Sequence, residues 1–587
     1  MRMSEDAKIS QQIGRILKRF GLPLLLLLTL VVSGDKAPLP LRIVSLGFAS
    51  GGTCPSGVPS GITSCYYIAA NGSDSNAGTT EASPWLHSPG MSACASTCAG
   101  VTPGPGIGFI FRGGDTWHFG NSGASPYVGA GSPGLNIIWS GTSSNHIYWG
   151  VDHTWFSGGS WVRPIFSGDN PFSSVGVSSC THDEASYTAV SWLGANNEYF
   201  DNIEMSGFCW HGNQQNLPGG TCCLTHMEGA QGSSTPSNNV INNVYIHGWS
   251  HVTFSCSLSG GEPTGNCDGA YGIAEGSNST YGQGDTIVNT VIDGQDTDQG
   301  SLCFICFAGY DIHNSVLRYG GNGAVTNNTH VFHDNLIDHM VSGKDGVTHT
   351  NGYEFNVEWN ASNAVYNNVI SNMWLTGICE VTQWMYPGTG LTDYNFNNLQ
   401  YNIGCNGNYF DAAAPHGTVN VFNNTWVVPS SGAIGGPLTG GTVNWGNNHC
   451  IIPGGTTSTN CYVSQGGTLN YLTDLIQTPT VASGQGYTST ETFAYSPAGG
   501  STVGAATNEQ TYCSNLLGSS DPLLQAAGKA CQQDTTFACS YSTSTHSVTC
   551  PARTPSPRPS SGNWDVGAYQ NTGGAPMPPT NVKAAPH

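Results

Sequence analysis

Charged residues are scarce in this 587-residue chain, where they make up 9% of the sequence against roughly 25% in an average globular protein. Lys and Arg together number 15, Asp and Glu number 36, and the formal net charge is −21. Nucleic-acid-binding proteins neutralise phosphates with clustered Lys and Arg, so the composition excludes that class. It also disfavours long solvent-facing helices, which normally carry many charged side chains.

Basic residues are nearly absent from the body of the chain. Seven lie within residues 1–42 and four lie after residue 528, which leaves Arg112, Arg163, Arg318 and Lys344 between them. Any chemistry in the body that needs a fixed cation must therefore use one of these four residues.

Glycine and asparagine are abundant instead, with 80 Gly and 49 Asn. The glycines have no three-residue period, which excludes collagen, and none of their clusters precedes the Lys-Ser/Thr pair of a nucleotide-binding loop. Hydrophobic residues at 38% and aromatic residues at 10% can build a core, so the chain is not disordered. A large all-β protein with many tight turns remains.

The N-terminus has the features of a secretory signal. Lys18 and Arg19 precede an apolar run, residues 22–32, which at about 11 residues is too short to cross a bilayer and has the length of a signal-peptide core. We expect residues 1–34 to be a signal peptide, with an uncleaved membrane anchor as the alternative, and residues 35–65 to form an N-terminal leader and cap.

The 20 cysteines are an even number in a chain expected to be exported, so disulfides are expected. Four pairs are close enough in sequence to be local bridges: Cys94/Cys98, Cys256/Cys267, Cys450/Cys461 and Cys531/Cys539. Cys303-x-x-Cys306 could provide two zinc ligands, but the sequence has no obvious second pair of ligands at a matching spacing. A structural disulfide or buried thiols are therefore expected there rather than a metal.

A repeated segment occupies residues 196–450, which hold 36 of the 49 asparagines. Each copy has alternating apolar residues, a polar pair containing Asn and a second apolar run, as in Val240-Ile241-Asn242-Asn243-Val244. Aligned on the second polar residue, the copies fall at positions 202, 243, 290, 315, 335, 368, 398, 424 and 448. A unit of about 20–26 residues explains most of the steps, with two units in each of the first two.

Period-two apolar patterning predicts strands, and a fixed unit of this length is typical of a solenoid. Asn tolerates the left-handed backbone that sharp bends need, and stacked Asn side chains can hydrogen-bond from coil to coil. A β-sandwich with Asn-rich turns is the alternative, but it does not require one repeated turn chemistry.

These residues resemble the right-handed parallel β-helix repeat proteins, the superfamily that includes the pectate-lyase-like enzymes. Residues 66–79 resemble the opening strand and Asn-Gly-Ser-Asp turn of secreted members, and residues 108–117 resemble their first full coil. Residues 564–569 contain Asp-Val-Gly-Ala-Tyr, which is similar to their terminal signature. The resemblance implies a β-helix over residues 66–450, C-terminal coils and a Cys-containing cap over 451–570, and a flexible Pro/Gly-rich tail over 571–587.

The same resemblance implies that a linear polysaccharide binds along one parallel sheet, between loops that leave the coils. The densest polar cluster lies within residues 311–358, and its expected catalytic residues are Lys344, Asp345, Arg318, Asp311, Asp338, His349 and Glu354. A lyase would use a base and a cation, and a hydrolase would use two carboxylates. The expected substrate-binding aromatics are Trp359, Trp374, Trp384, Tyr386 and Trp249.

Calcium is the one cofactor with candidate ligands, because Asp293, Asp296 and Asp298 could bind it through carboxylate oxygens. An acidic exposed turn is the alternative for this segment, which lacks the spacing of an EF-hand.

We therefore expect a secreted or cell-surface β-helix protein that acts on or binds extracellular polysaccharide, as a polysaccharide lyase or a glycoside hydrolase. The alternative is a non-catalytic structural, adhesive or glycan-binding surface protein, with the cell surface or its own copies as partners. Neither nucleic acid nor a nucleotide is expected as a partner. The acidic charge favours a neutral glycan over a polyanion.

Overall fold

The protein is described by a computed structural model. It covers residues 51–119, 134–172, 178–182, 189–192, 194–210, 221–225, 238–251, 256–259, 262–265, 270–274, 284–295, 302–306, 309–326, 329–340, 351–358, 361–373, 382–403, 410, 417–428, 434, 440–454, 461–462, 466–487 and 500–571. All of these belong to one compact unit, residues 49–587. The expected signal peptide and the Pro/Gly-rich tail beyond residue 571 lie outside the described residues.

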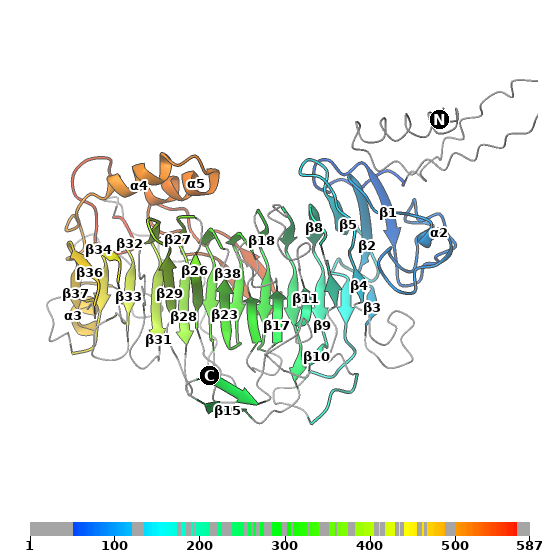
Figure 1. The fold of residues 1–587 in the computed structure, drawn as a ribbon, viewed down its shortest axis with the longest axis horizontal. Coiled ribbons are helices and arrows are strands. Elements are labelled where there is room, and N and C mark those ends of the chain that lie inside the picture. The colour runs from blue at the N-terminus through cyan, green and yellow to red at the C-terminus, as the bar shows by residue number, and fades with distance from the viewer. Residues whose placement is uncertain are drawn as a thin grey trace, which may run out of the picture. The chain divides into compact units, whose positions relative to one another are not determined.

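Strands stacked side by side dominate the fold, as Figure 1 shows. They form three long sheets in which every neighbouring pair of strands is parallel. Most coils contribute in turn to sheet A, sheet B and sheet C, and the last coils contribute their described strands to sheets A and B. Crossovers between parallel strands of one sheet are right-handed. The chain is therefore a right-handed parallel β-helix, as the repeat and the resemblance predicted.

Sheet A contains thirteen strands: Ser64–Ile68 (β1), Ile107–Gly113 (β2), Ile147–Phe156 (β5), Glu198–Asp201 (β8), Val240–Asn242 (β12), Thr286–Val288 (β18), Asp311–His313 (β21), Val331–His333 (β24), Ala364–Tyr366 (β27), Thr392–Phe396 (β30), Thr418–Phe422 (β32), Thr442–Gly446 (β34) and Thr468–Tyr471 (β36). Sheet B contains twelve strands: Thr116–His118 (β3), Ile165–Ser167 (β6), Glu204–Ser206 (β9), Tyr245–His247 (β13), Val291–Asp293 (β19), Val316–Arg318 (β22), Leu336–Asp338 (β25), Val369–Met373 (β28), Leu399–Ile403 (β31), Thr425–Val427 (β33), His449–Ile451 (β35) and Leu475–Gln477 (β37).

Sheet C contains eight strands: Leu135–Asn136 (β4), Val190–Ser191 (β7), Thr221–Thr225 (β11), Ala270–Ala274 (β17), Leu302–Cys306 (β20), Asn322–Thr326 (β23), Tyr353–Glu358 (β26) and Gln383–Pro387 (β29). Smaller elements are Cys209–Trp210 (β10), Ser250–His251 (β14), Cys256–Ser259 (β15), Glu262–Gly265 (β16), Ser540–Ser542 (β38), Ser547–Thr549 (β39) and the helices Ser96–Ala99 (α2), Pro479–Gly484 (α3), Gln510–Leu517 (α4) and Pro522–Cys531 (α5). No helix among the described residues is long and apolar enough to span a bilayer.

The core is a column of side chains that points into the coils, one from each strand of sheet A. In register these are Tyr66, Phe109, Trp149, Phe200, Ile241, Ile287, Ile312, Phe332, Val365, Asn395, Val421, Trp445 and Tyr471. Because side chains alternate along a strand, the residues on either side of this column face outward. The period-two pattern in the sequence records this alternation.

In the nine coils from β8 to β34, the chain turns from sheet A to sheet B through a residue in the left-handed conformation. These residues have φ between 52° and 58° and are Asn202, Asn243, Asn289, Asn314, Asp334, Asn367, Asn397, Asn423 and Asn447. The expected alignment of the repeat placed Asn202 and Asn243 at the same position as Thr290, and this was wrong by one residue. The strand register places them at the position of Asn289 instead. Each of these two copies carries its polar pair one position earlier than the others do.

The residue after each bend forms an internal ladder of polar side chains from Thr290 to Asp474. Its members are Thr290, Ser315, Asn335, Asn368, Asn398, Asn424, Asn448 and Asp474, and each donates its backbone N–H to the side chain of the next. The Asn398 amide also donates to Asn424 Oδ1 and to the Val365 carbonyl, both at 3.1 Å. The ladder thus satisfies buried backbone groups where each coil leaves its sheet.

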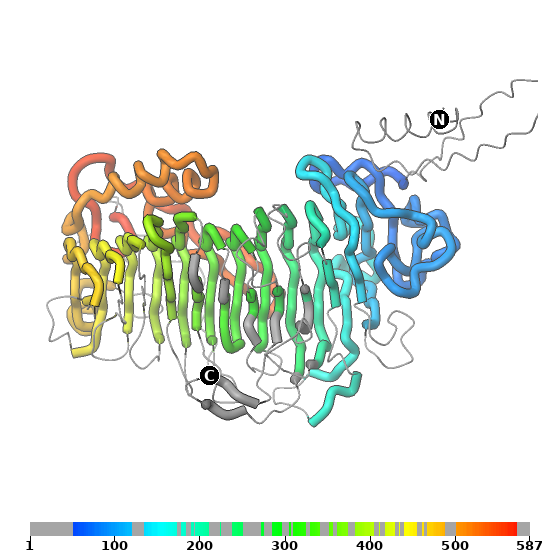
Figure 2. Tube along the Cα trace, viewed as in Figure 1, coloured from blue at the N-terminus to red at the C-terminus, as the bar shows by residue number. Residues whose placement is uncertain are grey.

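The C-terminal segment, residues 500–571, runs back over the coils (Figure 2). Helices α4 and α5 pack Leu516 and Leu524 over the outer face of sheet A at Tyr366 and Phe396. Phe537 and Tyr569 cover Leu399 on sheet B, and the β38–β39 hairpin covers Tyr245, Val291 and Val316. The segment therefore closes outer faces of both sheets A and B.

The terminal Trp-Asp-Val-Gly-Ala-Tyr sequence binds the last bends. The Asn423 amide donates to the carbonyl oxygens of Asp565 and Gly567 at 3.0 and 3.2 Å, and Arg558 donates to Asn397 Oδ1 at 2.9 Å. Gly567 has a φ of +90°, and a Cβ there would lie 2.8 Å from Thr425 Oγ1. Only glycine fits this close approach of the segment to the coils.

Six disulfides have both partners among the described residues: Cys54–Cys65, Cys94–Cys98, Cys180–Cys209, Cys450–Cys461, Cys513–Cys531 and Cys539–Cys550. The predicted pairs Cys94/Cys98 and Cys450/Cys461 are confirmed. The pair Cys531/Cys539 is wrong, because Cys531 bridges α5 to α4 while Cys539 closes the base of the β38–β39 hairpin. Cys306 is disulfide-bonded, whereas the Cys256, Cys267 and Cys303 side chains lie outside the described residues.

We predict that Asn398→Ala lowers the free energy of unfolding by about 3 kcal/mol or more, because it leaves several buried groups without a partner. The matched control is Asn470→Ala on the exposed outer face of sheet A, with an expected loss below about 0.5 kcal/mol. Denaturant unfolding of both variants measures the difference, and equal losses would show that the ladder has no special weight.

The last member of the ladder makes stability depend on pH. Burial raises the pKa of Asp474 from 3.8 to about 6, although its carboxylate accepts hydrogen bonds from Tyr471, Asn448 and Trp445. A raised folded-state pKa contributes stability below pH 3.8, and this is lost as the pH rises through about 6. Asp474→Asn removes the titration, so the variant should gain about 2–3 kcal/mol on the wild type between pH 4 and pH 7. An unfolding free-energy difference that is constant over this range would contradict the assignment.

Candidate functional site

The expected catalytic residues that are described lie on three different faces of the coils. Asp311 lies on sheet A, Arg318 and Asp338 lie on sheet B, and Glu354 lies on sheet C. Their buried neighbours Ile312, Leu317, Ile337 and Phe355 belong to the core, so alternation turns all four outward. These four residues therefore do not line one common groove.

On sheet B, Arg318 lies in register between Asp293 and Asp338. Its Nε is 3.6 Å from Asp293 Oδ1, and its guanidinium lies 5.3 Å from the ring centre of Tyr541 in the β38–β39 hairpin. Only 8% of the Arg318 side chain is exposed. Arg318 thus anchors the C-terminal segment and is covered by it, a position that suits a structural cation better than a catalytic one.

The carboxylate of Asp338 is also held by hydrogen bonds to neighbouring side chains. His339 Nδ1 lies 2.6 Å from its Oδ2, and Ser371 and Asn372 each donate to its Oδ1 at 2.8 Å. Burial alone would raise the pKa of Asp338, but these hydrogen bonds and the His339 and Arg318 charges lower it. The group is a fixed carboxylate rather than a proton donor.

The calcium prediction keeps only one described ligand, since Asp296 and Asp298 lie outside the described residues. Asp293 accepts hydrogen bonds from the Tyr541 hydroxyl and the Gln295 backbone, both at 2.9 Å, and is 3% exposed. Its oxygens therefore hold the hairpin and the following turn.

On sheet A, Asp311 lies beside two histidines of successive coils. Asp311 Oδ1 is 2.9 Å from His313 Nδ1 and 3.5 Å from His333 Nε2, and the three ligand atoms lie within 4.8 Å of one another. Burial alone would raise the pKa of Asp311, but hydrogen bonds from both histidines lower it well below its usual range. Burial would lower the pKa of His333, but its bonds to Asp311 and Asp334 raise it to about 9.

The two histidines lie in the polar cluster of residues 311–358 but were not among its expected catalytic residues, although the sequence carries a signal for them. His313 and His333 occupy the same position of successive repeats and pair in register, so they had to share a face. Their rings stack with centroids 4.8 Å apart, and the stack continues through Tyr366, Phe396 and Phe422.

On sheet C, three of the expected residues come together. Glu354 of β26 pairs in register with Trp384 of β29, and Tyr386 follows two residues later on the same face. The Trp384 and Tyr386 rings lie 4.7 Å apart at 50°, both partly exposed, and Asn351 donates to Glu354 Oε2 at 2.9 Å. Two aromatic faces beside a carboxylate form a surface on which a sugar chain could stack and be hydrogen-bonded.

A buried polar network holds this surface from inside the coils. The Tyr353 hydroxyl donates to Gln383 Oε1 at 2.5 Å and accepts from Asn395 at 2.7 Å. Gln383 also donates to Gln400 of sheet B at 2.9 Å. Because these bonds join all three sheets behind β26 and β29, the aromatic pair rests on a rigid base.

The remaining expected residues divide into two groups. Trp249 is fully buried in the core against Phe304, so it packs between coils and offers no face to a polysaccharide. Lys344, Asp345, His349, Trp359 and Trp374 lie outside the described residues and stay predictions.

The comparisons with known proteins support no particular activity. No protein-family model and no curated protein matches the chain. Among solved structures, two crystal structures of a GH136 lacto-N-biosidase from Eubacterium ramulus match with TM-scores of 0.37 and 0.33 at 12% identity, each covering 69% of this chain and 68% of that one. Pectate lyase Pel9A matches with a TM-score of 0.31 at 14% identity, covering 86% of this chain and 96% of that one.

We predict that Arg318→Ala destabilises the protein by about 3 kcal/mol, because it leaves buried carboxylates without their cation. The control Lys529→Ala at the end of α5 should change the unfolding free energy by less than about 0.5 kcal/mol. If the protein has a glycan-directed activity, Arg318→Ala should leave it intact below the unfolding temperature. An abolished activity with unchanged stability would restore Arg318 as a catalytic residue.

Proposed function

We propose that this protein is an extracellular, carbohydrate-active β-helix protein that binds a polysaccharide on the outer face of sheet C. The observation that carries the proposal is the pair Trp384 and Tyr386, partly exposed beside Glu354 on a rigid sheet. Sugar rings have apolar faces that pack on aromatic rings, and carboxylates accept hydrogen bonds from their hydroxyl groups. The six disulfides between described residues favour an oxidising location outside the cytoplasm.

A glycoside hydrolase acting on a neutral glycan fits this surface better than a lyase. A lyase needs a cation beside the reacting carbon, and Arg318, the one expected catalytic cation that the structure describes, is buried under Tyr541 on another sheet. The net charge of −21 also repels a polyanionic substrate. In this proposal Glu354 is the proton donor or base, and the two aromatics orient the chain.

A non-catalytic glycan-binding protein is the second candidate, favoured by the partner of Glu354. A hydrolase uses two carboxyl groups about 5–9.5 Å apart, whereas a binding protein needs Glu354 only as a hydrogen-bond acceptor, held in place by the amide of Asn351. Such a protein would use the same aromatic pair without turnover.

The test is a screen of the purified full chain against neutral plant, algal and bacterial glycans, with reducing ends and bound glycan both measured. Trp384→Ala should weaken binding about 10-fold, which corresponds to the loss of one stacking contact. The control Phe172→Ala removes an aromatic side chain that is 51% exposed on another part of the surface, and should change nothing.

Glu354→Gln separates the two candidates. An enzyme should lose turnover and keep glycan binding, and a binding protein should show no turnover before or after the change. Failure of the wild type to bind any glycan, or full binding by both Trp384→Ala and Tyr386→Ala, would overturn the proposed surface.

A further inference from the structure

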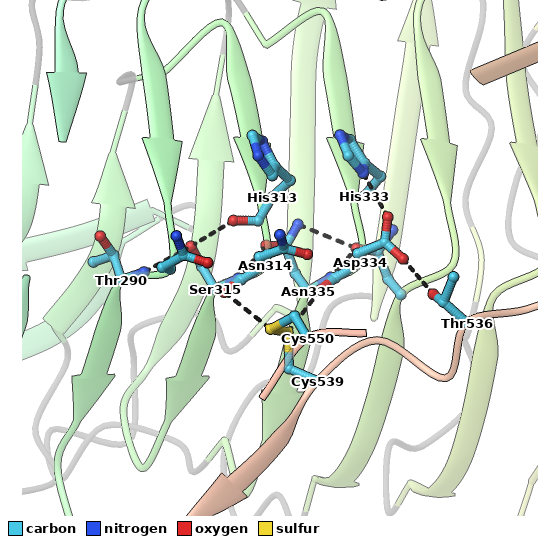
Figure 3. The surroundings of a disulfide bond; sticks show 12 residues. Thr290, His313, Asn314, Ser315, His333, Asp334, Asn335, Thr536, Cys539 and Cys550 are labelled. Atoms are coloured by element: carbon cyan, nitrogen blue, oxygen red, sulfur yellow. Dashed lines mark hydrogen bonds and ion pairs between the residues drawn. A yellow bond between two sulfur atoms is a disulfide. The ribbon is translucent and has the colours of Figure 1, made fainter. Parts of the chain in front are cut away.

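On the outer face of sheet A, on a different sheet from the aromatic pair, we propose a binding site for a divalent transition metal formed by Asp311, His313 and His333. The proposal goes beyond the glycan surface on sheet C and does not depend on it. Asp311 and His313 lie two residues apart on β21, and His333 lies one coil later on β24. Figure 3 shows both imidazole rings side by side, pointing the same way from the sheet.

The spacing of the three ligand atoms fits a metal of the size of zinc. Metal–nitrogen and metal–oxygen bonds of about 2.0–2.2 Å in a tetrahedral site put neighbouring ligand atoms about 3.3 Å apart. Asp311 Oδ1 lies 2.9 Å from His313 Nδ1 and 3.5 Å from His333 Nε2, and all three atoms are within 4.8 Å of one another. The two oxygen–nitrogen distances are within a few tenths of an ångström of this spacing, and the two histidine nitrogens would move toward each other on binding the ion.

The surroundings orient His333 as a ligand. Asp334 Oδ2 lies 2.6 Å from His333 Nδ1, so the opposite nitrogen, Nε2, faces Asp311. Asp334 is itself fixed by its left-handed backbone and by the Thr536 hydroxyl of the C-terminal segment (Figure 3). A carboxylate behind a ligating histidine fixes the ring and strengthens the ligand, and such groups typically affect affinity by 10–100-fold.

Packing holds the same ring from its other side. His333 stacks on Tyr366 with centroids 4.6 Å apart and an angle of 4° between the rings. The exposed fractions of the Asp311, His313 and His333 side chains are 12%, 22% and 18%, so the site is open to solvent on one side. The ligands are therefore preorganised and reachable.

The donor set selects the class of metal. Two imidazole nitrogens and one carboxylate suit Zn²⁺, Fe²⁺, Co²⁺ or Mn²⁺, whereas Ca²⁺ and Mg²⁺ prefer oxygen ligands alone. Three protein ligands leave at least one coordination position for water, as in catalytic rather than structural zinc sites. The second described group with close ligand atoms, Cys450, Cys461 and Asp474, is unsuitable because its sulfurs form a disulfide.

The experiment titrates the full chain, stripped of metal with a chelator, with Co²⁺ and Zn²⁺. We expect one equivalent of Co²⁺ to give a visible absorption spectrum with nitrogen ligands, and Zn²⁺ to displace it at micromolar or lower concentration. Every described cysteine is disulfide-bonded, so the spectrum should lack thiolate bands.

Three variants and one control make the assignment specific. His313→Ala and His333→Ala should each weaken binding at least about 100-fold, and Asp334→Asn should weaken it about 10–100-fold while keeping all three ligands. The control His118→Ala removes another histidine paired to a carboxylate, 2.6 Å from Asp169, that belongs to no group of three close ligand atoms among the described residues, and should bind as the wild type does.

Circular dichroism checks that each variant is folded, and His313→Gln replaces His313→Ala if the latter is not. No metal bound by the wild type would overturn the proposal, as would unchanged affinity in folded His313 and His333 variants. Calcium binding with no response to Co²⁺ would overturn it as well. None of these outcomes bears on glycan binding at Trp384, which is measured separately.

Discussion

The bend between sheets A and B determines where every other residue of a coil lies. At the bends from Asn289 to Asn447, one residue takes the left-handed conformation and the next sends its side chain inward to the ladder from Thr290 to Asp474. Because each ladder residue binds the backbone of its neighbour, successive coils cannot slip by one residue without breaking this chain of bonds. Such a slip would exchange inward and outward faces in every strand, so the ladder fixes which side chains reach the surface.

The surface that results is divided by the C-terminal segment. Residues 500–571 cover apolar outer residues of sheets A and B, including Phe396, Leu399 and Val316. Among the residues that remain partly exposed are the histidines at the end of the ring stack on sheet A, and Trp384 with Tyr386 on sheet C. The proposed metal site therefore lies on sheet A beside the region that the C-terminal segment covers, and the proposed glycan surface lies on sheet C.

The repeat in the sequence was sufficient to predict the β-helix and its asparagine bends, because each bend needs the same local chemistry. It was insufficient to place the candidate site residues. The four described candidates are close in sequence but lie on three different sheets: Asp311, Arg318, Asp338 and Glu354. The repeat identifies only the bend between sheets A and B, so it does not show which sheet each of these residues joins. The pairing of His313 with His333 could have been read from the 20-residue step between them.

The C-terminal return escaped prediction for a different reason. Thr536 binds Asp334 and Tyr541 binds Asp293 across 202 and 248 residues, and no periodicity connects such partners. The wrong pair Cys531/Cys539 has the same origin, since closeness along the chain says little once a segment folds back over distant coils. Local sequence patterns therefore predict the coils, whereas the path of the C-terminal segment depends on tertiary contacts alone.

The path of the C-terminal segment also has a consequence for the order in which the molecule is completed. His546 contacts Tyr245, which the ribosome makes 301 residues earlier. Coils can stack on one another as they emerge, but their outer apolar residues stay bare until the last part of the chain arrives. A chain that ends before residue 500 would thus expose apolar outer faces of sheets A and B, which residues 500–571 cover in the folded protein. Exposure of these faces would therefore distinguish truncated copies from copies that contain this segment.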